Sequence, residues 1–160
     1  AAGGTIVKST VTTDSTTAAA NNTYGVFVGC SYTNAQSQPI DAQYYPGNSG
    51  ISNAVAFVVD DPMAAFKVAV TYSGNTTVTT VNQSIVGTNV PVVQNAGSTI
   101  TGDSALAVYA TNAAGNAAAL PLRVVAVVPD TNVTSTTFCE VIVKLNNPQI
   151  LTAAGLDYAA

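Results

Sequence analysis

The sequence predicts an all-β protein, either a single-domain antiparallel β-barrel or a jelly-roll-like sandwich, with long loops and at most one or two short helical turns. Apolar residues alternate with other residues at a period of two in several segments, which is the spacing of a strand with one buried face. No segment keeps the apolar spacing of an amphipathic helix over about ten residues. Turn-forming residues separate the alternating segments at short intervals, as in barrels and sandwiches.

The expected strands are the alternating or β-branched segments 24–33, 54–59, 66–72, 76–81, 106–110, 122–128 and 138–145. In the first of these, alternation places Val26, Cys30 and Tyr32 on one face of the strand. Gly25 and Gly29 fall on the other face, and they predict either a bulge or the close approach of another backbone.

Two later segments depart from simple alternation. Gly87 and Pro91 interrupt residues 84–93, so this segment is expected to form only short or edge strands. The segment 122–128 is apolar on both faces and is therefore expected to be a central strand.

The longest irregular stretch is 34–53, and a loop of this length in a compact domain usually has a function or covers other residues. It carries the candidate protein-contact residues Tyr44, Tyr45, Pro46 and Gly47. One interpretation is that the tyrosines pack over an open barrel end or a sheet edge. The other is that they anchor a contact with another protein, because tyrosine is enriched at the centres of interfaces. The sequence supports both interpretations equally.

The sharpest corner in the chain is Asp60-Asp61-Pro62, which separates two alternating runs. An aspartate followed by proline is typical of a capped helix start, but at most one helical turn fits before alternation resumes. Consecutive residues of an extended chain point to opposite faces, so the two carboxylates make a poor acid–base pair. Calcium would suit these oxygen ligands, but no D-x-D-x-D loop is present. The corner is interpreted as a structural bend.

The composition narrows the function. A chain of 160 residues suits one domain, with an extended N-terminal arm over 1–23 and a C-terminal tail over 146–160. Only 8% of the residues are charged, which favours a chain packed against others. The net charge is −4 and the four cations are scattered, which argues against nucleic acid. No apolar run approaches the roughly 18 residues of a membrane-spanning helix, so no membrane partner is expected.

The residues that usually carry catalysis are scarce. The chain has no histidine, and neither G-x-S-x-G nor S-x-x-K occurs. We therefore expect no enzyme activity, no catalytic residues, no cofactor and no metal. The two cysteines, Cys30 and Cys139, each lie on the apolar side of an expected strand. This pattern favours buried free thiols, and it also allows a disulfide if the two strands are neighbours.

Three runs of residues resemble, in order, a family of small structural proteins of tailed-phage virions that are encoded beside the major capsid protein. The runs are YGVFVGCSYTNAQ at 24–36, QYYPG at 43–47 and AFVVDDPMAAFKV at 56–68. The closing VIVKLNNPQI at 141–150 is also similar to the last strand of that family. This chain departs from the family at Lys67, where an acidic residue or Gln is frequent, and in its N-terminal region.

The resemblance implies a capsid decoration, or cement, protein of a bacteriophage. Such a protein is an all-β homotrimer seated at three-fold or quasi-three-fold positions on the exterior of an HK97-type capsid, where it bridges neighbouring major capsid proteins. It would be assembled in the host cytoplasm. The rival hypothesis is a carbohydrate-binding or adhesin-type β module on a virion or cell surface. The absence of tryptophan counts against this rival. An enzyme of glycan processing would need two well-placed carboxylates, which the sequence does not offer.

Overall fold

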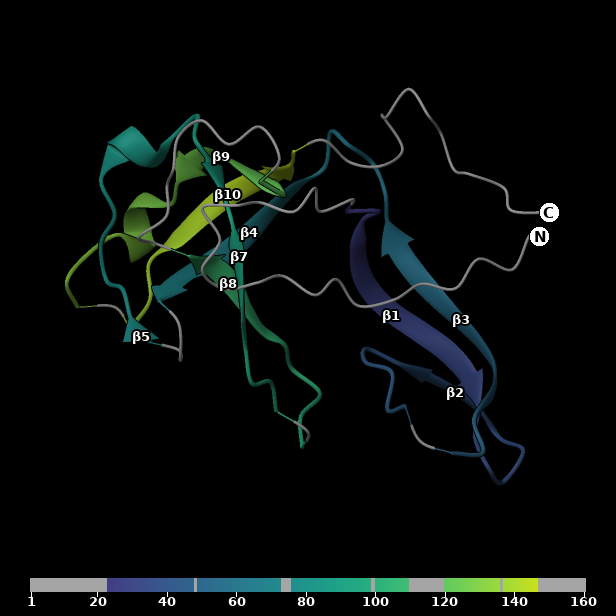
Figure 1. Cartoon of the computed structure of the whole chain (residues 1–160). Helices are drawn as coiled ribbons and strands as arrows, with labels where there is room; N and C mark the ends of the chain where they lie inside the picture. The colour runs from purple at the N-terminus through teal and green to yellow at the C-terminus, as the bar shows by residue number, and fades with distance from the viewer. Residues whose placement is uncertain are drawn as a thin grey trace.

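Two β-sheets make up the computed structural model, which describes residues 23–47, 49–72, 76–98, 100–109, 120–135 and 137–146 (Figure 1). The smaller sheet has the order β2-β1-β3, and both of its strand pairs are antiparallel. Its strands are β1 (Val26–Thr33), β2 (Pro39–Ala42) and β3 (Ser52–Val59). The expected N-terminal arm and C-terminal tail lie almost wholly outside the described residues.

The larger sheet has seven strands in the order β6-β9-β10-β4-β8-β7, with β5 paired to β4 beside this path. The strands are β4 (Ala65–Tyr72), β5 (Thr76–Thr77), β6 (Asn89–Val90), β7 (Val92–Asn95), β8 (Ala105–Tyr109), β9 (Leu122–Val127) and β10 (Glu140–Leu145). All pairs are antiparallel except the parallel pair β4–β8. The helical content of the described residues is two short 3₁₀ turns, η1 (Gln83–Ile85) and η2 (Pro129–Thr131). The predicted all-β class is confirmed.

Pro91 explains how the larger sheet curls into a nearly closed barrel. The strands β6 and β7 lie at opposite ends of the sheet order, yet only Pro91 separates them in the chain. Proline has no N–H to donate, so the ladder of hydrogen bonds breaks there. The chain therefore changes its pairing partner at Pro91, from β9 for β6 to β8 for β7. The Pro91 carbonyl still accepts a hydrogen bond from the Tyr109 N–H at 3.1 Å. The prediction of short strands on either side of Pro91 is therefore confirmed.

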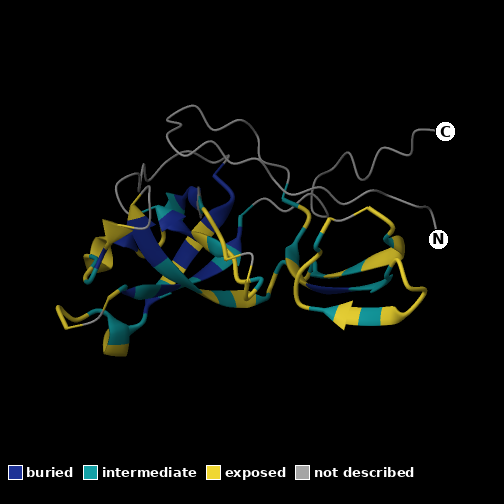
Figure 2. Cartoon of the chain, turned by 90° about the horizontal axis from the view of Figure 1, so that it is seen from below, coloured by how far each residue is buried: buried dark blue, intermediate teal, exposed yellow. Residues whose placement is uncertain are grey.

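The hydrophobic core lies inside this barrel (Figure 2). The predicted alternation in β10 is borne out, because the alternate residues Cys139, Val141, Val143 and Leu145 are all buried. Buried valines from β4, β6, β7, β8 and β9 complete the core around them. Residues of the three-stranded sheet are mostly exposed or half-buried by comparison. Val26 at the start of β1 is packed against the barrel core.

Three strand predictions need correction. The stretch 34–53 is not wholly irregular, because β2 forms within it. The Asn34 side-chain oxygen accepts hydrogen bonds from the backbone N–H groups of Gln36 and Gln38, and this local turn returns the chain alongside β1. The predicted strand 76–81 is only two residues long. β9 lies between β6 and β10 as expected for a central strand, but Val125 is 43% exposed, so one of its faces is open.

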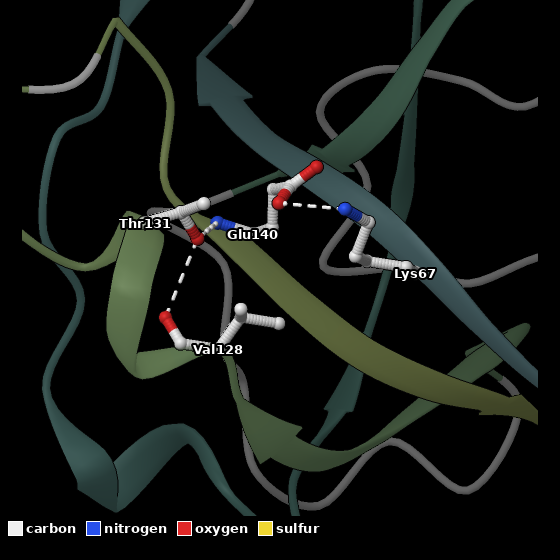
Figure 3. Close-up of polar contacts among 4 residues, drawn as sticks. All are labelled: Lys67, Val128, Thr131 and Glu140. Atoms are coloured by element: carbon white, nitrogen blue, oxygen red, sulfur yellow. Dashed lines mark hydrogen bonds and ion pairs between the residues drawn. The ribbon is translucent and has the colours of Figure 1, made fainter.

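Polar contacts fasten the start of β10 to its neighbours (Figure 3). The Lys67 ammonium lies 3.1 Å from the Glu140 carboxylate, joining β4 to β10 across the outside of the sheet. The Thr131 hydroxyl donates to the Val128 carbonyl and accepts from the Glu140 N–H, at 3.3 and 3.0 Å. The ion pair is exposed on the lysine side, so its contribution to stability is small.

The two cysteines are free and buried: Cys30 lies in β1 of the small sheet, and Cys139 directly precedes β10 of the larger sheet. Burial, helped by the nearby Asp41 carboxylate, raises the pKa of the Cys30 thiol above its ordinary value of 9.0. Burial also raises the pKa of the Cys139 thiol. The folded chain therefore keeps both protons in a pH range where the unfolded chain has lost them.

Because the folded state binds more protons, stability is full below about pH 9 and falls as the pH rises further. We expect the free energy of unfolding, measured by urea denaturation, to decline as the pH rises above about 9. In Cys139→Ala this decline should be shallower than in the parent protein, because one thiol no longer contributes. Equal slopes in the two proteins would contradict the assignment.

Candidate interaction surface

The two faces of the three-stranded sheet differ in how they are covered. The register places Cys30 opposite Ala42 and Ala56, which share one face, here called the inner face. Ser31 lies opposite Asp41 and Val55, which share the other face, here called the outer face.

The candidate contact loop, Tyr44 to Gly47, lies against the inner face. The Cys30 thiol donates to the Tyr44 carbonyl at 3.4 Å. The ring of Tyr45 meets that of Tyr32 edge to face, with centroids 6.2 Å apart and planes at 89°. Such aromatic pairs stabilise a fold beyond the area they bury. These contacts place the tyrosine loop against one face of the small sheet. Both rings nevertheless remain partly exposed.

A second loop lies between β7 and β8, and its described residues 98 and 100–103 join the contact loop. Gly102 has a φ of 75°, and a Cβ at this position would overlap the ring of Tyr44. Glycine is therefore required both for the backbone conformation and for the ring contact. The Gln43 side-chain amide also donates to the Thr101 carbonyl at 3.1 Å. Through these contacts a loop of the barrel is attached to a loop of the small sheet.

The loop 98–103 is held in shape by its own hydrogen bonds. The Ser98 hydroxyl accepts from the N–H groups of Ile100 and Thr101, at 3.3 and 3.1 Å. The Ser98 carbonyl accepts from the Gly102 N–H, and the Ser98 N–H donates to the Asp103 carbonyl, both at 3.0 Å. The turn therefore presents Ile100, which is 93% exposed, in a defined position.

Tyr44, Tyr45 and Ile100 together are called the loop patch. Sequence reasoning identified the two tyrosines and missed Ile100. The available signal was a single isoleucine in a turn-rich segment, GSTITG, where apolar residues have no strand face to join. Pro46 is half-buried, and Gly47 has a φ of 66° with open space around it. Pro46 and Gly47 thus shape the loop, while the large side chains of the patch provide its contact area.

The outer face carries a separate pair of exposed apolar side chains. Val55 and Phe57 lie two residues apart on β3, with 56% and 49% of their surfaces exposed. Gly29 is the register partner of Phe57 on β1, so no neighbouring side chain covers the ring from that strand. A Cβ at Gly29 would also come within 3.1 Å of the Ala42 carbonyl, which explains the glycine.

The Asp60-Asp61-Pro62 corner connects β3 of the small sheet to β4 of the barrel (Figure 1). The Asp61 carboxylate accepts from the Met63 N–H at 2.8 Å, and the Asp61 carbonyl accepts from the Ala64 N–H at 3.1 Å. These bonds close a β-turn with Pro62 in its second position, where proline is favoured. The corner therefore holds a β-turn and no helical turn, and the chain enters β4 immediately afterwards. The aspartate caps the bend as predicted, but it caps a β-turn.

Replacing Asp61 with alanine should lower the free energy of unfolding by about 1 kcal/mol, because one backbone N–H loses its partner. Asp60→Ala provides the control, since no hydrogen bond is found for the Asp60 side chain among the described contacts. Urea denaturation of the two variants measures the difference. Equal free energies of unfolding for the two variants would show that the Asp61 cap does not stabilise the fold.

The described residues contain no group of three or more His, Cys, Asp or Glu side chains placed to hold a metal ion. Among the same residues, no helix is both long enough and apolar enough to cross a membrane. A hollow of about 330 Å³ lies beside η1 and is lined by Tyr72, Val78, Thr80, Val81, Asn82, Ser84, Ile85 and Thr88. These side chains are neutral, so the hollow holds no acid–base pair.

Comparison with models of known protein families, with curated proteins and with solved structures gave no match. The interpretation of the surface therefore depends on its residues and on the resemblance described above.

Proposed function

We propose that this protein is a structural virion protein that binds the outside of an HK97-type phage capsid and cements neighbouring major capsid proteins. The observation that carries the proposal is the loop patch, in which Tyr44, Tyr45 and Ile100 are exposed on two loops fastened to each other. Buried aromatic and large aliphatic anchors dominate the free energy of protein interfaces. The two tyrosines of the patch lie in the segment QYYPG, which is part of the family resemblance.

Pre-organisation makes this patch suited to binding a rigid surface. Each loop is already held by hydrogen bonds, so little conformational entropy is lost when the side chains are covered. The described part of the loops carries one charged residue close to the patch, Asp103, so desolvation of ionic groups is a small cost. The proposed mechanism is binding alone, without a chemical step.

Trimerisation would multiply this binding. Three loop patches on one homotrimer, seated at a three-fold or quasi-three-fold position, would contact several capsid proteins at once. Linked contacts of modest affinity then give a much lower dissociation rate, because each released patch rebinds while the others hold. The proposed location is the virion exterior, with assembly in the host cytoplasm.

The hollow beside η1 supports the second candidate, a carbohydrate-binding module. Tyr72 and the neutral polar side chains of Thr80, Asn82 and Ser84 are types that sugars contact. However, the Asn82 side-chain oxygen already accepts from the Ser84 N–H at 2.9 Å, which caps η1. This engagement favours a structural role for the hollow, and the capsid proposal is preferred.

Co-sedimentation with undecorated capsid shells tests the proposal. The purified protein should pellet with shells of the phage that encodes it, saturate at a fixed ratio to the major capsid protein, and raise the temperature at which the shells release DNA. Failure to pellet with those shells would contradict it. A glycan array run on the same sample tests the rival, and tight binding to a defined sugar without shell binding would establish the carbohydrate-binding function.

A further inference from the structure

The open edge of the three-stranded sheet is β3. It pairs with β1 on one side, and no described strand pairs with its other side. Such an edge presents a row of backbone N–H and C=O groups, which proteins usually protect with charges, prolines or short length. The opposite edge is protected in this way, because β2 has four residues and includes Pro39 and Asp41.

β3 has none of these protections. Its eight residues, SNAVAFVV, include no charged residue and no proline. The irregularity in its own backbone is Asn53, which has a φ of 52° and lies where the register with β1 shifts. From Val55 to Phe57 its register partners follow one another residue by residue, and the register shift between Phe57 and Val58 comes from an extra residue in β1, Val28. The strand therefore offers a regular apolar edge to an incoming strand.

We propose that β3 pairs antiparallel with β3 of a second copy of this chain, about a two-fold axis at Ala56, to form a continuous six-stranded sheet. An uncharged strand can pair with itself without bringing like charges together. A two-fold contact also uses the same surface on both copies, so one unprotected edge is sufficient. Head-to-tail pairing with β2 would instead place Pro39, which lacks an N–H, in the new ladder.

The outer face sets the register. In an antiparallel pair centred on Ala56, Val55 lies directly opposite the partner's Phe57, and Phe57 opposite the partner's Val55. The four side chains then form one apolar strip across the new strand pair, covering the two exposed large apolar residues of β3. A pair centred one residue away, on Val55, would place Phe57 opposite the partner's Asn53 and lose this match. The contact is separate from the loop patch and concerns the free protein in solution, whereas the proposed homotrimer is the form bound to assembled shells, so it does not depend on the proposed function.

Sedimentation equilibrium of the full chain tests the association. We expect a reversible dimer at concentrations of about 10–100 µM, because an edge contact of this size is weak. Val55→Lys should raise the dimer dissociation constant at least tenfold, since it places like charges near each other across the pair. Val125→Lys is the matched control. This valine is also exposed, but it lies on β9, which is paired on both sides in the larger sheet. The dimer dissociation constant of this variant should therefore match that of the parent protein. A parent protein that stays monomeric, or equal effects of the two lysines, would overturn the proposal.

Cysteine cross-linking tests the register. Mixing Val55→Cys with Phe57→Cys should give a disulfide-linked dimer under mild oxidation, because these positions lie opposite each other at a separation that suits a disulfide. Each variant alone should cross-link at least tenfold more slowly, since identical positions lie on a diagonal. The parent protein is the blank, because Cys30 and Cys139 are buried. Equal rates in the mixture and the single variants would overturn the Ala56-centred pair.

Discussion

Ile100→Asp should weaken binding to capsid shells by about 30-fold or more, because loss of an interface anchor typically costs about 2 kcal/mol. Ile100 is the most exposed large apolar residue of the described chain, and its loop is fastened to the tyrosine loop. The aspartate removes the apolar contact and places a charge that would have to be desolvated. In a trimer the loss is repeated at each patch, so the apparent effect on a decorated shell should be larger.

Co-sedimentation at a fixed shell concentration measures this change. Val86→Asp provides a matched control, because Val86 is an exposed valine in the turn after η1, away from both tyrosines. Its binding should equal that of the parent. Both variants should unfold at the parent's urea concentration, since neither side chain is buried. Unchanged shell binding by Ile100→Asp would remove the loop patch from the interface.

Gly25→Ala should destabilise the three-stranded sheet by about 2 kcal/mol, because an added methyl group has no room. A Cβ at Gly25 would lie 2.5 Å from both the Val58 Cγ1 atom and the Val59 carbonyl oxygen. The valine side chain can shift, but the carbonyl belongs to the backbone of the paired strand. Gly25 also precedes Val26, the β1 residue that packs against the barrel core.

Hydrogen exchange locates this effect. Amides of β1 and β3 should lose protection in Gly25→Ala, while those of β9 and β10 keep it. Gly87→Ala is the control, because open space surrounds its Cβ position. Its φ of 86° gives it a backbone cost of its own, about 1 kcal/mol, but in the barrel segment beside η1. Unaltered protection of β1 and β3 in Gly25→Ala would show that the close approach is not maintained in solution.

The alternation of β10 was readable from the sequence because its inward residues are apolar and its outward residues include Glu140 and Lys144. The same reasoning from alternation assigned residues of β1 to the wrong faces. Alternation placed Val26 and Cys30 on one face, but the register puts the bulge between Phe27 and Gly29, which adds one residue. An added residue reverses every face beyond it, so Phe27 and not Val26 shares the face of Cys30. The glycines predicted a bulge, but not its consequence for the pattern.

Contacts between residues far apart in the chain could not be predicted from local sequence patterns. The division into two sheets is one example, since the runs on either side of Asp61 look like consecutive strands of one sheet. The loop patch is another. Tyr44 and Gly102 are far apart in the chain, and only the fold brings the ring onto the glycine. β2 was missed because it is short and begins with proline, and such strands depend on their partner for definition.

We propose that this protein coats a capsid through its loop patch, and cryo-electron microscopy of the virion tests this proposal most directly. We expect density for this chain on the outside of the shell, at three-fold or quasi-three-fold positions, with Tyr44, Tyr45 and Ile100 facing the major capsid protein. A map in which the shell carries no density for this chain would rule out the proposed function.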